Sequence, residues 1–124
     1  MSDEATRVLH VLEDWCREAQ VSPADGTEEA GLAVCAVIML HPLLPHPTDV
    51  LHCVVNELLR RLSRVQHLVV TTERVLLTRV GVAGRRRYER SGVRHERESV
   101  MLPPAVKAAV ALFDAPGGMS RRVA

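Results

Sequence analysis

The sequence predicts a single α+β domain with about three N-terminal helices, a four-stranded antiparallel β-meander and a C-terminal helix. Apolar residues recur at helical spacing as far as about residue 65, runs rich in Val, Leu and Thr follow, and a last helical stripe comes near the C-terminus. A length of 124 residues with 47% hydrophobic residues suits one domain, which we place at residues 1–118, with a flexible tail at 119–124. Two alternatives stay open: an all-α domain with a helix at 73–80, and a winged-helix-like fold whose wing is a hairpin.

The first helix is expected to begin after Ser2, its N-cap, and to end near Gln20. Asp3 and Glu4 fall in its first turn, where negative charge suits the positive end of the helix dipole. Its apolar stripe consists of Val8, Val11, Leu12, Trp15 and Ala19. Turn-forming residues at 22–26 separate this helix from the second one.

The second helix is expected to begin after Thr27, a candidate N-cap, and to end before Pro42. Residues 30–40 carry no charged side chain, so the helix has no polar face. Such a helix is buried at the centre of a domain or is covered by a partner. We therefore expect a core helix, with the alternative that part of it docks with Leu43 and Leu44 on a partner or on a second copy.

The third helix is expected to run from Thr48 and Asp49 to about Val65, with one apolar face and one basic face. The apolar face consists of Leu51, Val54, Val55, Leu58, Leu62 and Val65. The outer face carries Arg60, Arg61 and Arg64.

Four strands are expected to follow, at residues 67–71, 74–82, 85–90 and 93–102. Ser91-Gly92 suits a tight hairpin turn between the last two. The strand at 85–90 is nearly all charged, which is typical of an exposed edge strand. The closing helix is expected to start at Pro103-Pro104, and its apolar side consists of Val106, Ala109, Val110 and Phe113.

Charge is divided along the chain although its net value is only +1. Acidic residues dominate the N-terminal third, whereas the expected hairpin at 85–97 is rich in arginine. Guanidinium groups bind phosphates and an aromatic ring can stack on a base. The candidate binding residues are therefore Arg85, Arg86, Arg87, Tyr88, Arg90, Arg94 and Arg97. The interleaved Glu89, Glu96 and Glu98 favour the other interpretation, a solvated or protein-facing edge.

Patterns typical of catalytic and metal sites are missing from the sequence. It contains no Gly-x-Ser-x-Gly elbow, no phosphate-binding glycine loop that leads into a helix, and no Cys-x-x-Cys pair. His41, His46, His52 and Cys53 lack the spacing of a zinc site, and Cys35 lies in an apolar stretch that suits a core thiol. We expect no enzymatic activity, no cofactor and no bound metal.

The sequence also lacks a signal-peptide pattern, and its longest apolar run, 31–40, is shorter than the roughly 20 residues that span a bilayer. We expect an intracellular protein, cytoplasmic or nuclear, with reduced thiols and no membrane partner. The favoured function is a small non-catalytic interaction protein, an adaptor or complex subunit. It would bind a protein partner or a second copy through an apolar helix surface and the charged hairpin. The alternative is a nucleic-acid-binding protein that uses residues 85–97.

Overall fold

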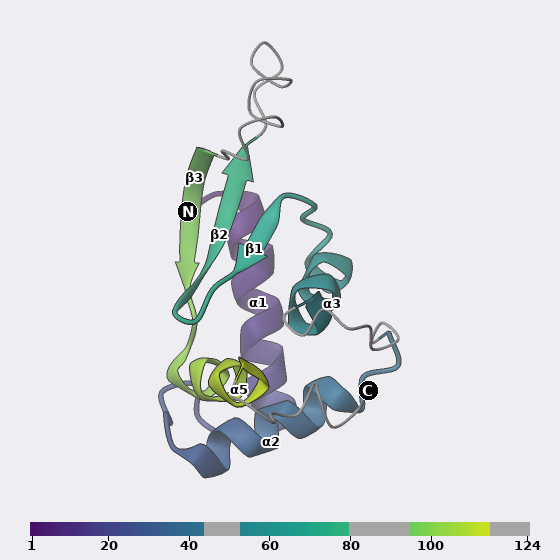
Figure 1. The fold of residues 1–124 in the computed structure, drawn as a ribbon, viewed down its shortest axis with the longest axis vertical. Coiled ribbons are helices and arrows are strands. Elements are labelled where there is room, and N and C mark those ends of the chain that lie inside the picture. Colours follow the sequence, from purple (N-terminus) through teal and green to yellow (C-terminus); the bar gives the residue numbers. More distant parts are fainter. Residues whose placement is uncertain (44–52, 80–94, 115–124) are drawn as a thin grey trace.

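The computed structural model describes residues 1–43, 53–79 and 95–114 (Figure 1). Its helices and strands are α1 (Asp3–Glu18), α2 (Glu28–Met39), α3 (Cys53–Ser63), β1 (Leu68–Val70), β2 (Arg74–Arg79), β3 (His95–Met101) and α5 (Pro104–Asp114). The mixture of helices with an antiparallel sheet confirms the predicted α+β class. The all-α alternative is wrong because β2 occupies the segment that it assigns to a helix.

The described strands form one antiparallel sheet in the order β1-β2-β3. Val75 at the centre of the sheet lies opposite Val70 of β1 and Val100 of β3. The predicted four-stranded meander is not confirmed, because β2 pairs directly with β3 and leaves no place between them for a strand at 85–90. That segment itself lies outside the described residues.

The ladder between β2 and β3 contains one irregularity. Leu77 lies opposite Glu98, but the next residue, Thr78, lies opposite Glu96, so the backbone of Arg97 has no opposing residue. An extra residue of this kind is a β-bulge, which bends a strand and increases its twist. Residues 80–94 connect the two strands beyond their last pair, Arg79 and His95.

The helices lie on one side of the sheet and at one of its ends (Figure 1). α1 runs behind the strands, α3 lies beside β1, and α2 and α5 pack on each other at the end of the sheet opposite the C-terminal end of β2. The inner face of the sheet is almost fully buried, through Leu68, Val75, Leu77 and Val100. On the outer face Met101 is 65% exposed. Alternation along the strands therefore separates a core face from a solvent face.

Both predicted N-caps are confirmed. The Ser2 hydroxyl accepts a hydrogen bond from the backbone N–H of Ala5 at 3.1 Å, and the Thr27 hydroxyl accepts one from Ala30 at 3.2 Å. Ser2 also joins the helix layer to the sheet, since its backbone N–H and its hydroxyl donate to the two carboxylate oxygens of Glu98, at 3.1 and 2.5 Å.

α1 ends at Glu18, close to the predicted end near Gln20, and Gln20 itself follows the C-cap in a left-handed conformation with φ of 59°. The N–H of Gln20 donates to the carbonyl of Arg17, and the N–H of Val21 donates to the carbonyl of Cys16. This pair of bonds is the Schellman motif, which satisfies the last helical carbonyls and turns the chain away.

Side chains of α3 form hydrogen bonds with the edge of β1 that does not pair with β2. The Asn56 side-chain oxygen accepts from the N–H of Val70 at 3.0 Å, and Arg60 donates to the carbonyl of Leu68 at 3.2 Å. Four helical residues advance the chain by about 6 Å and two strand residues by about 6.6 Å, so the two spacings match. α3 therefore takes the place of a neighbouring strand, which protects an edge that would otherwise be open to pairing.

Candidate interaction surface

One face of α2 is sealed inside the protein. This sealed face consists of Ala30, Gly31, Val34, Cys35 and Ile38, all of which are buried. It packs on α5 and α1, and the approach to α5 is so close that a Cβ at Gly31 would lie 2.8 Å from the Cβ of Ala108. Glycine is therefore required there by the short distance between two helices.

The opposite face of α2 is open. Leu32 is 46% exposed and Leu40 is 82% exposed, with the exposed Ala36 midway between them. These residues are four positions apart, so they form one row along the helix. Leu43 lies just past the helix end, three residues after Leu40, and is 50% exposed. We call Leu32, Ala36, Leu40 and Leu43 the α2 stripe.

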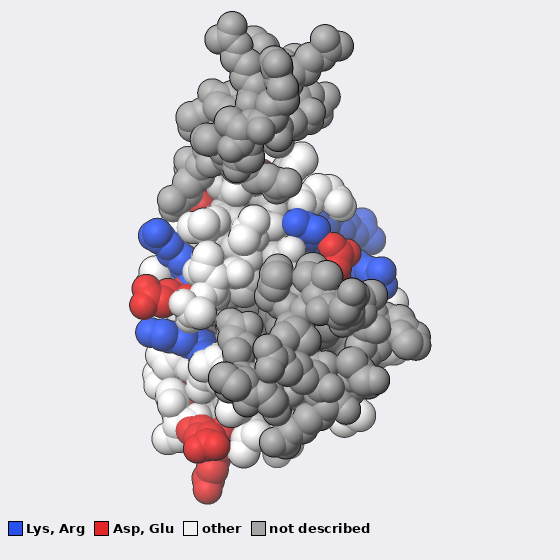
Figure 2. All heavy atoms as spheres, in the orientation of Figure 1, with Lys and Arg blue, Asp and Glu red and all other residues white. Residues whose placement is uncertain are grey.

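The α2 stripe begins at an acidic end. Glu28 and Glu29 form the first turn of α2, and both are exposed. Glu28 lies four residues before Leu32 and so begins the same row. Figure 2 shows Asp and Glu side chains gathered at the lower end of the molecule, where α2 begins in Figure 1. These carboxylates also suit the positive end of the α2 dipole.

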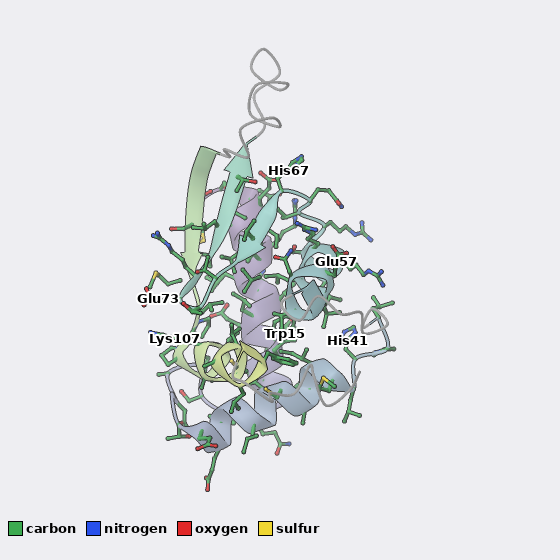
Figure 3. All side chains as sticks on the ribbon, in the orientation of Figure 1. Trp15, His41, Glu57, His67, Glu73 and Lys107 are labelled. Carbon is green, nitrogen blue, oxygen red and sulfur yellow. The ribbon has the colours of Figure 1, made fainter. Side chains whose placement is uncertain are left out.

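The α2 stripe ends at a basic end. The exposed Arg61 of α3 donates from Nη1 to the carbonyl oxygen of Leu43 at 3.2 Å. His41, which Figure 3 places beyond the end of α2, accepts from the N–H of Leu43 through Nδ1 at 3.0 Å. Nearby, the Glu57 carboxylate is engaged at 2.7 Å by a different guanidinium, that of Arg60. Figure 2 shows Lys and Arg side chains, with an acidic side chain between them, at the place where Figure 1 has α3.

The arginine-rich site that the sequence predicts lies largely beyond the described residues. That is the position of Arg85, Arg86, Arg87, Tyr88, Arg90 and Arg94. Arg97 lies on β3 at the bulge. Of the acids that the sequence interleaves with these arginines, Glu98 faces the helix layer and bonds to Ser2.

Cys16 and Cys35 are buried thiols. Burial raises the pKa of Cys35 from 9.0 to about 11, and its Sγ lies 3.4 Å from the carbonyl oxygen of Ala109 on α5. The pKa of Cys16 is also raised, first by burial and then by the charge of Glu13. Since a thiolate is the reactive form of cysteine, both side chains have the environment of core residues and not of activated nucleophiles.

Two further features of the described residues bear on the class of site. Among residues 1–43, 53–79 and 95–114, no group of three or more His, Cys, Asp and Glu side chains is placed to hold a metal ion. Over the same ranges, no helix combines the length and apolar character that crossing a membrane requires.

Comparisons with known proteins identify no relative from which the role of this surface could be inferred. No protein-family description matches this chain, and neither the curated proteins nor the solved structures include a match.

Sequence reasoning identified α2 but not which of its faces is open. Residues 30–40 are apolar at every position, so no periodicity distinguishes a sealed side from an exposed one. The one available signal was Gly31, because a glycine inside a helix lowers helix propensity and often marks a close approach of another backbone. It would have placed the buried side on the Gly31 face and left Leu32 and Leu40 outside.

Proposed function

We propose that this chain is a small non-catalytic interaction protein, an adaptor or a subunit of a complex, which binds a protein partner through the α2 stripe. The support is the exposure of Leu32, Leu40 and Leu43 on a helix whose other face is already packed against α5. Single exposed leucines are common on soluble proteins, but a contiguous exposed apolar patch is typical of a binding site.

The observation that carries this proposal is the lack of any polar residue along the helical row after Glu28, which consists of Leu32, Ala36 and Leu40. A helix on the surface of a domain ordinarily turns a polar face to water. Here the water-facing side is leucine and alanine, with charge only at its two ends. An apolar centre with a charged rim is the composition of protein–protein interfaces.

The test is affinity purification of the tagged protein from cells of its source organism, followed by identification of the proteins bound to it. We expect the double variant Leu32→Ser/Leu40→Ser to lose the complexes that the wild type forms. Met101→Ser serves as the control, because Met101 is a large hydrophobic residue, 65% exposed, on the sheet and not on α2. If the wild type and both variants behave alike, the α2 stripe is not the binding surface.

Nucleic-acid binding by the arginine-rich residues 85–97 stays a prediction from the sequence. Changing Arg85, Arg86, Arg87 and Arg90 to Glu should abolish retention on heparin or DNA, and wild-type binding should fall steeply with salt, because each phosphate contact releases counterions. The variant Leu32→Ser/Leu40→Ser should leave that retention unchanged. If the wild-type protein passes through both columns at low salt, the nucleic-acid hypothesis fails.

A further inference from the structure

We propose that the α2 stripe binds a second copy of itself, with the two α2 helices antiparallel across a two-fold axis. This inference rests on the proposed function, since it names the partner of the same surface. Its basis is the distribution of charge and side-chain size along the α2 stripe and at its two ends.

The charges at the two ends of the stripe are complementary. The exposed Glu28 and Glu29 lie at one end, and the exposed Arg61 contacts the carbonyl of Leu43 at the other. A two-fold axis perpendicular to α2 reverses the direction of the second copy, so the acidic end of each α2 meets the basic end of its partner at both sites. A surface that fits itself in this way is what an isologous dimer requires. A parallel arrangement would bring the carboxylates of the two copies together.

The side chains suit the same arrangement. Ala36 is the midpoint of the row, with Leu32 four residues before it and Leu40 four residues after it. When two antiparallel helices cross at Ala36, Leu32 of each copy faces Leu40 of the other, and the small alanine lets the axes approach. The leucines then fill the spaces on either side of the crossing, as ridges pack into grooves.

The stripe has the size of a weak interface. Stable complexes bury about 800 Å² on each partner, and three leucines and an alanine offer less. The net charge of +1 gives two copies little mutual repulsion. We therefore infer a dimer in equilibrium with its monomer, in which the leucines provide most of the affinity and the charges set the orientation.

Sedimentation equilibrium over a concentration series measures this association directly. The wild type should shift from monomer to dimer, Leu40→Ser should raise the dissociation constant at least about tenfold, and the sheet variant Met101→Ser should match the wild type. A wild type that stays monomeric up to about 1 mM overturns the inference, because a specific dimer should have a dissociation constant below that concentration. A dimer that Leu40→Ser leaves unchanged also overturns it.

Charge exchange tests the antiparallel orientation. The variants Glu28→Lys/Glu29→Lys and Arg61→Glu, confirmed as folded by circular dichroism, should each dimerise about fivefold or more weakly, since like charges then meet at both ends. Mixed in equal amounts, they should recover wild-type association, because every end again meets its opposite charge. A mixture that associates no better than its components contradicts the antiparallel pairing.

These measurements separate this inference from the proposed function. A wild-type protein that is monomeric, yet loses a different protein partner when Leu32 and Leu40 become serine, overturns self-association and leaves the α2 stripe as a binding surface. A dimer that is lost in Met101→Ser and kept in Leu40→Ser overturns self-association through the stripe, and the complexes recovered with Leu32→Ser/Leu40→Ser then decide the proposed function.

Discussion

The two sides of α2 have nearly the same composition and opposite environments. On the sealed face, Gly31 approaches Ala108 so closely that an added Cβ would lie 2.8 Å away. On the open side, Leu40 is 82% exposed although it belongs to the same apolar run. Apolar composition alone therefore does not define a core. A helix without a polar face can bury one side against the rest of its own domain and expose the other side to a partner.

The largest effect should come from enlarging the sealed face. Gly31→Leu inserts a side chain where even a methyl group has no room, so we expect unfolding free energy to fall by roughly 1–3 kcal/mol or more. The matched control is Ala36→Leu, which makes a similar enlargement on the open side and should change stability by no more than about 0.5 kcal/mol in dilute solution. Urea denaturation measures both. Equal losses in the two variants would remove the distinction between the faces.

Alkaline pH should reveal the burial of Cys35. The pKa of the unfolded thiol is near 9.0, but burial raises the pKa of the folded thiol to about 11. The stabilisation is fully present below pH 9 and is lost as pH rises toward 11, at about 1.4 kcal/mol per pH unit for this one group.

Urea denaturation between pH 8 and 11 measures that slope, with Cys35→Ala as the comparison. The variant should be less stable at every pH because its side chain is smaller, but its stability should decline less steeply with pH. Some slope should remain, since the raised pKa of Cys16 acts in the same direction. Parallel profiles for the two proteins would show that Cys35 is not buried as described.

The smallest effect on folding should come from the α2 stripe. Leu32→Ser/Leu40→Ser should change the unfolding free energy by no more than about 0.5 kcal/mol in dilute solution, because both side chains already face water. Val34→Ser, on the sealed face, should cost about 2 kcal/mol or more through lost packing and a buried hydroxyl. Thermal melts at low protein concentration give the comparison. A large loss in the stripe variant would mean that these leucines belong to the core.

The sequence predicts the elements better than their arrangement. Ser2 and Thr27 are caps in the structure because capping is a local interaction between a side chain and the next turn. The pairing of β2 with β3 is not local, and the charged run at 85–90, predicted as an edge strand, contains nothing that indicates its neighbour. The contact of Arg60 is another that local sequence patterns do not predict. It was expected on an outer face, yet it bonds the edge of β1, which only the packing of α3 could reveal.

The candidate site, like the fold, could be predicted from the sequence only in part. The apolar character of residues 30–40 is visible in the sequence, and it is enough to indicate α2 together with Leu43 as a candidate docking segment. Gly31 is the one residue in the sequence that indicates the open direction, because that direction depends on where α5 packs, and α5 is some seventy residues away in the chain. Arg61 at the end of the stripe was hidden, since its contact with Leu43 joins α3 to the residues that follow α2.

Thiol labelling of Leu40→Cys in dilute native protein tests the two-sided character of α2 most directly, because Cys35 already reports on the sealed face. Reaction with a maleimide, followed by peptide mass spectrometry, measures both positions in one sample. The introduced thiol should be modified rapidly, while Cys35 reacts only after unfolding. Equal labelling of the two positions in folded protein would contradict this account.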